Sequence, residues 1–271
     1  MNEADMNPVA VLGITGRVGR CLVRAIRESP DFVLSGALAS PTSAALGRDA
    51  GEVAQTGPVA VAVTANRAEA LAKARVAIDF TLPEALQDNL AAAEEAGIPM
   101  VVGMTGLDAT RQAALRRFSE RHAVLVAPNM SLAVNLLFGL AGRAAAALPA
   151  DYDVEILEAH HRGKADAPSG TALRLGEIVA GARGGTLAER AVYGRVGDTG
   201  GRATGAIGFA SLRAGDIVGQ HQVLFAGPGE SLEFVHRTTD RMTFAYGALA
   251  AARWIIGRPP GLYGMSDVLG I

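Results

Sequence analysis

The sequence contains very little cysteine and few aromatic residues. Cys21 is the only cysteine among 271 residues, so no disulfide can form within the chain, which suits the reducing cytosol. Aromatic residues make up 5% of a sequence that is 49% hydrophobic, so alanine, valine and leucine must fill the core. The first residues, Met1–Asn7, are polar and acidic and do not resemble a secretory signal. We therefore expect a cytoplasmic protein.

Long apolar runs and basic tracts are also missing. No uncharged apolar run reaches the roughly 18 residues of a membrane span. Residues 132–148 come closest, but Asn135 and Arg143 interrupt them. The formal net charge is −2 without a basic tract, which argues against nucleic acid as a partner. We therefore expect neither a membrane nor nucleic acid as partner, and a small molecule as substrate.

Strand-like and helix-like segments alternate up to about residue 130. Apolar runs predict strands at 8–12, 32–38, 59–63, 75–80, 99–102 and 123–126. Helical periodicity lies between them, at 18–28, 67–73, 84–96 and 108–121. This alternation predicts an α/β fold with a Rossmann-like, doubly wound parallel sheet, in which ligands bind beyond the carboxyl ends of the strands.

The pattern changes after residue 131. A helix is predicted at 132–147, a strand at 152–158, and strand-rich segments at 190–196, 203–213, 216–226 and 231–238. A last helix, 241–257, is expected to pack back on the first domain. We therefore predict a dinucleotide-binding domain of residues 1–130 and 241–271. We expect residues 131–240 to form a second, α+β domain whose mixed sheet binds substrate and serves oligomerisation.

A glycine-rich turn follows the first strand. Residues 13–19 read GITGRVG and lie between a strand and an amphipathic helix, the context of a dinucleotide-binding loop. A plain βα turn is the alternative interpretation. The second strand ends at Ala39, without the carboxylate that usually binds the ribose hydroxyls. Because Arg17 and the hydroxyls of Ser40, Thr42 and Ser43 can receive a 2′-phosphate, we expect NADPH to be accepted, without excluding NADH.

Residues 158–172, which read EAHHRGKADAPSGTA, carry the clearest chemistry. His160 and His161 precede Lys164, and Ser169 is a natural N-cap for the helix that follows. The backbone N–H groups of residues 170–172 would point outward and, with the helix dipole, form an anion site. Each element alone has an ordinary explanation as surface pair, solvated lysine or helix start. Together they predict a site that holds a carboxylate and moves protons, and no metal, because no further ligand lies at metal-site spacing.

The position of the two histidines depends on where the preceding strand ends. Strict alternation along a strand would send His160 and His161 to opposite faces. Both can serve one pocket only if the strand breaks near Ala159 or His160. The break is plausible because Gly163 and a polar run follow.

With these motifs together, the chain resembles the dihydrodipicolinate reductase family of bacterial diaminopimelate and lysine biosynthesis. The resemblance covers nearly the whole chain and is strongest in residues 158–172. Its supporting motifs are Gly16–Gly19, Asp79–Thr81, Arg213–Gly219 with His221, and Arg241–Phe244. It implies reduction of 4-hydroxy-tetrahydrodipicolinate (dihydrodipicolinate) to tetrahydrodipicolinate by NADPH or NADH, in a homotetramer built through the second domain.

The resemblance also implies roles for individual residues. His160 would be an acid or base, and Lys164 a proton donor. The substrate carboxylate would be held by His161, Ser169, Gly170 and Thr171. The cofactor would be bound by Gly13, Ile14, Thr15, Gly16, Arg17, Val18, Gly103, Thr105, Ala127, Asn129 and Met130.

Two alternatives stay open. One is another nicotinamide-dependent imine reductase or amino-acid dehydrogenase of the same architecture, which would not explain why Lys164 and residues 169–171 accompany the histidine pair. The other is a non-enzymatic dinucleotide sensor, which would need neither Lys164 nor His160.

Overall fold

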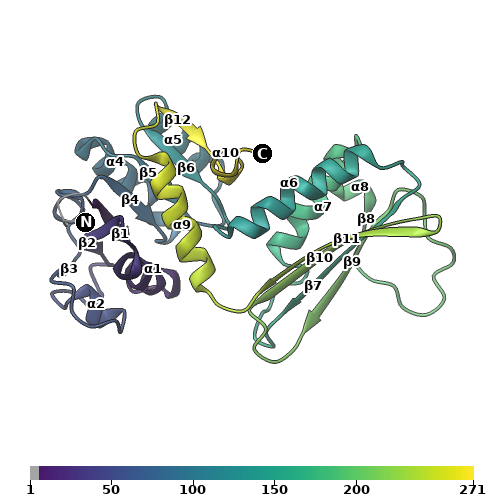
Figure 1. Cartoon of the computed structure of the whole chain (residues 1–271), viewed down its shortest axis with the longest axis horizontal. Helices are drawn as coiled ribbons and strands as arrows, with labels where there is room; N and C mark the ends of the chain where they lie inside the picture. The colour runs from purple at the N-terminus through teal and green to yellow at the C-terminus, as the bar shows by residue number, and fades with distance from the viewer. Residues whose placement is uncertain (1–5) are drawn as a thin grey trace. The chain divides into compact units, whose positions relative to one another are not determined.

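The computed structural model describes residues 6–271 and divides into two compact units (Figure 1). The first unit comprises the chain up to Leu132 together with Arg241–Gly270, and the second comprises Ala133–Asp240 with Ile271. Most of the polar start, Met1–Asn7, lies outside the described residues. None of the helices within residues 6–271 is long and apolar enough to cross a membrane.

The first unit is built on a seven-stranded sheet in which every neighbouring pair of strands is parallel. Its strand order is β12-β6-β5-β4-β1-β2-β3. The strands are β1 (Asn7–Leu12), β2 (Phe32–Leu38), β3 (Val63–Thr64), β4 (Val76–Asp79), β5 (Met100–Val102), β6 (Ala123–Val126) and β12 (Gly261–Tyr263). After β1 the chain adds β2 and β3 toward one edge of the sheet. After β4 it adds β5, β6 and finally β12 toward the other edge. The carboxyl ends of β1 and β4 therefore flank the switch point at which such sheets bind ligands.

Helices cover both faces of this sheet. Along β1, Val9 and Val11 belong to one apolar cluster while Ala10 and Leu12 belong to another, as expected for a strand buried on both sides. Helices α1 (Arg17–Glu28), α9 (Met242–Ile255) and α10 (Met265–Leu269) contribute to the first cluster. Helices α3 (Arg67–Leu71), α4 (Leu86–Ala96) and α5 (Ala109–Ser119) contribute to the second. The predicted doubly wound parallel sheet is confirmed.

The second unit contains a mixed sheet of five strands in the order β11-β10-β7-β9-β8. These are β7 (Asp153–His160), β8 (Ala191–Val192), β9 (Ile207–Arg213), β10 (Gly219–Gly227) and β11 (Glu230–Thr238). β10 runs antiparallel to both β7 and β11, whereas β9 runs parallel to β7 and β8. The helices that accompany this sheet are α6 (Leu132–Ala147), α7 (Gly170–Ala182) and α8 (Leu187–Arg190).

Only one face of the mixed sheet is covered by helices. Helices α6 and α7 lie along this face (Figure 1). Their apolar side chains form one cluster with Ile156, Phe209 and Phe225 of the sheet. The opposite face exposes apolar side chains, of which Leu212 and Val235 are 53% and 44% accessible. Alternation along each strand thus separates a core face from an open apolar face.

Some predicted strands are wrong in extent, and several short helices and strands of the structure were not predicted from the sequence. The segment predicted as a strand at 59–63 contributes only Val63 to β3, because Ala60 adopts a positive φ of 58° that interrupts extended chain. The strand predicted at 190–196 ends after Val192. Elements of three to five residues carry too few positions to show a period, and these include α2 (Ala50–Val53), α8, β12, α10 and a 3₁₀ turn, η2 (Pro83–Ala85).

Candidate active site

Strand β7 delivers its last two core-facing side chains, Glu158 and His160, to one end of the mixed sheet. Val154, Ile156 and Glu158 are buried, and His160 continues the same alternation. The predicted break falls directly after His160. His161 begins a turn in which its carbonyl oxygen accepts from the backbone N–H of Lys164 at 3.1 Å. His160 is therefore the last residue of the strand and His161 the first of the turn, so strand alternation does not fix the direction of His161.

Strand register surrounds Glu158 with polar side chains from other strands. Glu158 pairs with Ser211 on β9 and with His221 on β10, and His221 pairs with His236 on β11. These positions continue the core face of the sheet, whose inner positions are apolar. A polar row thus lies across four strands where the apolar core ends.

The carboxylate of Glu158 is buried, with 1% of its side chain exposed, and is fully bonded. Arg213 donates to both of its oxygens, at 2.8 and 2.7 Å, and the backbone N–H of Ser169 donates at 3.2 Å. Its fourth contact is His160 Nδ1 at 2.5 Å. Burial alone would raise the pKa of this carboxyl, but the hydrogen bonds from Arg213, His160 and Ser211 prevail and hold the pKa at about 2. Glu158 is therefore ionised at neutral pH.

This carboxylate determines which nitrogen of His160 carries a proton. An ionised carboxylate only accepts hydrogen bonds, so Nδ1 must donate to it. Burial lowers the pKa of His160 below its usual value, and the attraction of Glu158 opposes that only in part. In the neutral ring Nε2 is then the hydrogen-bond acceptor. Nε2 lies close to Gly219, where a side chain's Cβ would come within 3.3 Å of it. His160 is thus arranged to exchange a proton through Nε2.

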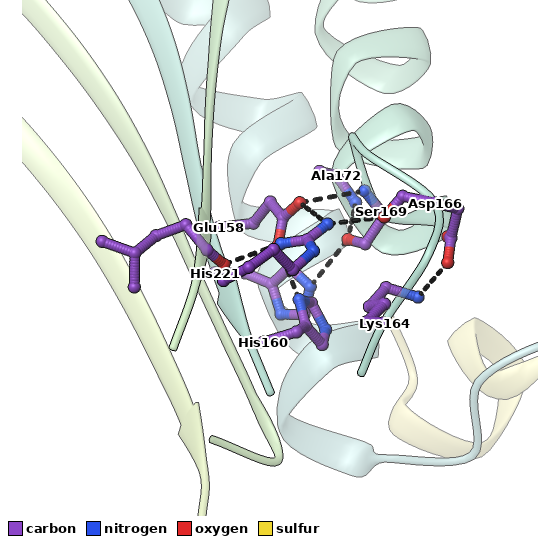
Figure 2. A network of polar contacts seen from close by, with 9 residues as sticks. Glu158, His160, Lys164, Asp166, Ser169, Ala172 and His221 are labelled. Atoms are coloured by element: carbon purple, nitrogen blue, oxygen red, sulfur yellow. Dashed lines mark hydrogen bonds and ion pairs between the residues drawn. The ribbon is translucent and has the colours of Figure 1, made fainter. Parts of the chain in front are cut away.

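The start of α7 lies beside this pair (Figure 2). Ser169 is the N-cap, and its Oγ accepts from the backbone N–H of Ala172 at 3.2 Å, as the sequence predicts. The prediction that the N–H of Ala172 points outward is therefore wrong, because the cap occupies it. Ser169 Oγ also contacts His221 Nε2 at 3.2 Å. Gly170 is exposed, and a Cβ there would meet nothing within 4 Å, so the helix start is open to a ligand.

Lys164 stands in the turn between β7 and α7 and is paired with an acid. Its Nζ lies 2.8 Å from Asp166 Oδ1, with 22% of the lysine side chain exposed (Figure 2). Its charge is close enough to help lower the pKa of His160 and of His221. The pKa of His221 falls to about 3, chiefly through burial. His221 is therefore neutral at neutral pH.

The structure thus gathers most of the predicted substrate residues. His160, Lys164, Ser169 and Gly170 belong to one strand end, one turn and one helix start, with Thr171 in the first turn of α7. The sequence assigned no role to Glu158, Arg213 or His236. The sequence did contain a signal for Glu158: it precedes His160 by two residues on a strand, and residues two apart on a strand lie on the same face. The others come from strands distant in sequence.

The glycine-rich loop of the first unit has the shape of a phosphate cradle. Gly13 adopts a φ of 89°, and a Cβ on it would lie 2.8 Å from the carbonyl oxygen of Phe80. A Cβ on Gly19 would lie 2.2 Å from the carbonyl oxygen of Gly13. Helix α1 begins at Arg17 after Gly16, with no side-chain cap and no acid in its first turn. These residues fit a nucleotide pyrophosphate, because backbone N–H groups at an uncapped helix start attract anions.

The predicted cofactor residues all follow strands β1, β5 and β6 of one parallel sheet. Gly13, Ile14, Thr15, Gly16, Arg17 and Val18 follow β1, Gly103 and Thr105 follow β5, and Ala127, Asn129 and Met130 follow β6. Parallel strands end at the same edge, so these loops share one rim. Met130 and Ala127 are 1% and 3% exposed and belong to the apolar core beneath the rim. Ala39 is 5% exposed and packs in the core, so its side chain does not face the rim.

Among residues 6–271 no cluster of His, Cys, Asp and Glu side chains suits a metal ion. A Rossmann-like unit with an open phosphate cradle stands in the same chain as a buried carboxylate–imidazole pair, a lysine and an anion-binding helix start. These features define a two-unit oxidoreductase that uses a nicotinamide dinucleotide.

Comparisons with known proteins narrow this class. The family model for the N-terminus of dihydrodipicolinate reductase matches residues 7–130, and the model for its C-terminus matches residues 133–269. The 4-hydroxy-tetrahydrodipicolinate reductase of Rhodopseudomonas palustris (strain BisB18) is 50% identical over 268 residues, 99% of this chain and 98% of that protein. The corresponding reductase of Nitrosomonas europaea is 48% identical over 263 residues, 97% of this chain and 98% of that protein.

A solved structure agrees. A dipicolinate-bound dihydrodipicolinate reductase from Paenisporosarcina sp. TG-14 matches with a TM-score of 0.77 and 25% identity, covering 97% of this chain and 99% of that one. An amine dehydrogenase from Mycobacterium smegmatis, at a TM-score of 0.56 and 15% identity, shares the fold alone. The chain belongs to the dihydrodipicolinate reductase family.

Proposed function

We propose that this protein reduces 4-hydroxy-tetrahydrodipicolinate to tetrahydrodipicolinate with NADPH or NADH, as a step of diaminopimelate and lysine biosynthesis. One observation carries the proposal: the start of α7, capped by Ser169, lies beside the Glu158–His160 pair at the end of β7 and beside the turn that holds Lys164. Family membership adds the reaction, and the dipicolinate bound to a solved relative matches a small dicarboxylate substrate.

The residues of the second unit have distinct tasks in this reaction. Ser169, Gly170, Thr171 and His161 would hold a substrate carboxylate, because the start of α7 favours negative charge. The nicotinamide supplies a hydride to the conjugated imine of the substrate. Negative charge would then develop toward the ring nitrogen, and a proton from Lys164 would complete the reduction. His160 holds its proton on Nδ1 when neutral, so it would deliver a proton from Nε2 only after that atom has taken one up. Lys164 contacts Asp166 with one of its three N–H donors, which leaves the others for substrate.

We assign the two tasks to separate units. The first unit, predicted as residues 1–130 and 241–271, would bind the nucleotide through its glycine loop and the rim after β5 and β6. The second, predicted as residues 131–240, would bind substrate and build the oligomer. We place the enzyme in the cytoplasm, because its single cysteine suits a reducing compartment.

A homotetramer is the proposed assembly, with the open face of the mixed sheet as its interface. Leu157, Leu212 and Val235 lie on that face along a shallow groove of about 320 Å³. An exposed apolar face of this kind favours another protein surface over water. Light scattering should give the mass of four chains, and Val235→Glu should lower it. A monomer at micromolar concentration would contradict the assembly and leave the reaction untouched.

A coupled assay tests the reaction. Dihydrodipicolinate synthase generates the substrate, and the loss of NADPH or NADH absorbance reports its reduction. A second arm offers amino acids and amines with the oxidised cofactors, since an amine dehydrogenase shares the fold. Turnover in the second arm and none in the first would replace our proposal with a dehydrogenase. Tight nucleotide binding with no turnover in either arm would indicate a sensor.

A further inference from the structure

We infer that Glu158 is a positioning residue, whose carboxylate aims the ring of His160 and anchors the start of α7, and that Arg213 holds this carboxylate in place. The role in catalysis rests on the proposed function. The geometry itself does not, because it concerns only side chains within the second unit.

Glu158 connects three separate parts of the unit. It lies on β7 and contacts His160 on the same strand, Arg213 on β9 and the backbone N–H of Ser169 at the start of α7. Arg213 in turn donates to the backbone carbonyl of Asp166 at 2.6 Å, in the turn that carries Lys164. One carboxylate and one guanidinium therefore bring the imidazole, the lysine turn and the anion site together.

The burial of this carboxylate indicates a specific task. A charged group with 1% of its side chain exposed costs free energy unless it is paired and hydrogen-bonded. The bidentate contact with Arg213 supplies the pairing. An apolar residue would fill this position in the core without needing such a partner, as Ile156 and Val154 do on the same strand. What an apolar residue cannot supply is an acceptor for His160 Nδ1 and for the N–H of Ser169.

The contact with Nδ1 sets both the orientation and the tautomer of the imidazole. When one ring nitrogen of a histidine donates to a carboxylate, the other is the atom left to take up or release a proton. In His160 this places proton exchange on Nε2. Without Glu158 the ring would be free to rotate and to carry its proton on either nitrogen. Turnover would then fall while nucleotide binding, which belongs to the other unit, would not.

Several charged groups face His160, and their effects differ in sign. Glu158 on β7 raises the pKa of His160, whereas Lys164 in the turn and Arg213 on β9 lower it. The ring of His221 on β10 meets that of His160 edge-on at 5.2 Å and stays neutral. His236 on β11 stacks behind His221 at 6.1 Å. Glu158 is thus the acid that opposes the surrounding cations, and neutralising it must lower the pKa of His160.

Nuclear magnetic resonance of the histidine rings tests this inference without any turnover. The chain has five histidines, so the signals of His160 can be identified by their loss in His160→Gln. In the unmodified protein, nitrogen-coupled spectra should show the proton of neutral His160 on Nδ1. A proton on Nε2 instead would overturn the inference, and this measurement requires no variant of Glu158.

Glu158→Gln should move the titration of His160 to lower pH. Glu155→Gln is the matched control, because Glu155 lies on the same strand and is bound by Arg195 and Arg202 at 2.9–3.2 Å, away from the site. It should leave the His160 titration where it is. Should Glu158→Gln not fold, Glu158→Gln with Arg213→Met removes the unpaired cation and should lower the His160 titration as well. A His160 titration unchanged by the loss of Glu158 would contradict the inference.

Kinetics then separate positioning from simple structural support. Glu158→Gln should lower kcat by about 10- to 100-fold, less than the full contribution of a proton-transfer group, with the KM for NADPH unchanged. Glu158→Asp restores the charge and should recover part of the His160 titration. If the unmodified protein fails to reduce the substrate, the proposed function fails, yet the ring measurements still decide whether Glu158 positions His160.

Discussion

Helices α1 and α7 both begin at a candidate anion site, and the two sites are built differently. The start of α1 has Gly16 as its N-cap, no side-chain hydrogen bond at that cap and two further glycines, Gly13 and Gly19, beside it. The start of α7 has a serine cap whose backbone and hydroxyl contact Glu158 and His221. Neither helix carries an acid in its first turn. The first site depends on backbone shape, and the second depends on charged and polar side chains.

This difference fits what each site has to do. A nucleotide phosphate must be held close to the backbone while nothing reacts at it, and glycine permits that approach. In the proposed function the second site must also deliver a proton, so it needs groups whose protonation the protein controls. We therefore expect the first site to respond to added atoms and the second to respond to changes of charge. The following predictions test that contrast, from the largest effect to the smallest.

Loss of the lysine should have the largest effect. Lys164→Ala should lower kcat/KM by about 100- to 10,000-fold, the usual contribution of a proton-transfer group, while the fold survives. The chain has only two lysines, so Lys73→Ala, on the exposed surface of the first unit, is the matched control and should be neutral. Steady-state assays and circular dichroism check both proteins. Near-normal kcat/KM in a folded Lys164→Ala protein would exclude the lysine from the chemistry.

The second-largest effect is expected when one methyl group is added to a glycine at the first site, whereas the same addition at the second site should be tolerated. Gly13→Ala requires a side chain at a φ of 89° and places its Cβ 2.8 Å from a carbonyl oxygen. Strain of this kind costs about 1–3 kcal/mol before the clash is counted, so we expect a lower melting temperature and much weaker NADPH binding. Gly170→Ala meets nothing within 4 Å and should fold and bind NADPH normally. Thermal denaturation and calorimetric titration compare the two. If Gly13→Ala and Gly170→Ala were equally well tolerated, the two sites would not differ in their response to added atoms.

Acid should weaken the second site through Glu158. Its pKa is about 2 in the folded protein against an ordinary 4.5, so its ionised form stabilises the fold. That contribution is complete above pH 4.5 and is lost as the pH falls toward 2. Asp79 in the first unit behaves oppositely, because burial raises its pKa and its ionisation at higher pH costs stability.

Hydrogen exchange of peptides from β7 and β4 measures this contrast locally. Protection of β7 should fall between pH 4.5 and the acid limit of the measurement, and this pH dependence should shrink in Glu158→Gln. An identical acid response of β7 in that variant would assign the effect to other carboxylates.

The two sites also differ in how far the sequence could predict them. The glycine loop and the histidine–lysine turn are continuous segments, and local patterns locate both. Buried parallel strands such as β2 and β6 are apolar runs, so their bounds match the prediction. Arg213 and His221, which lie beside Glu158 on β9 and β10, are instead more than 50 residues away from it in sequence. They depend on strand pairing in a mixed sheet, which no local period encodes.

Cofactor preference should show the smallest effect, because it depends on one exposed charge. Arg17 is the first residue of α1 and is exposed, as is Arg20 one turn further along. We expect Arg17→Gln to raise the KM for NADPH by a few-fold to tenfold, since one charge contact at a solvated site contributes about 1 kcal/mol. The KM for NADH, which lacks the 2′-phosphate, should stay the same. Arg20→Gln should change neither value.

A complementary change adds an acid to the same rim. Ala39 occupies the usual place of the ribose-binding acid, but its side chain packs in the core, so Ala39→Asp would bury a charge and report on stability. Ser40 is exposed at the next position, and Ser40→Asp should shift preference toward NADH by repelling the 2′-phosphate. Steady-state kinetics with both cofactors decide the matter. If Arg17→Gln weakens NADH and NADPH equally, Arg17 contacts the pyrophosphate instead. In that case the first site, like the second, depends on a charged side chain, and the contrast between them is one of degree.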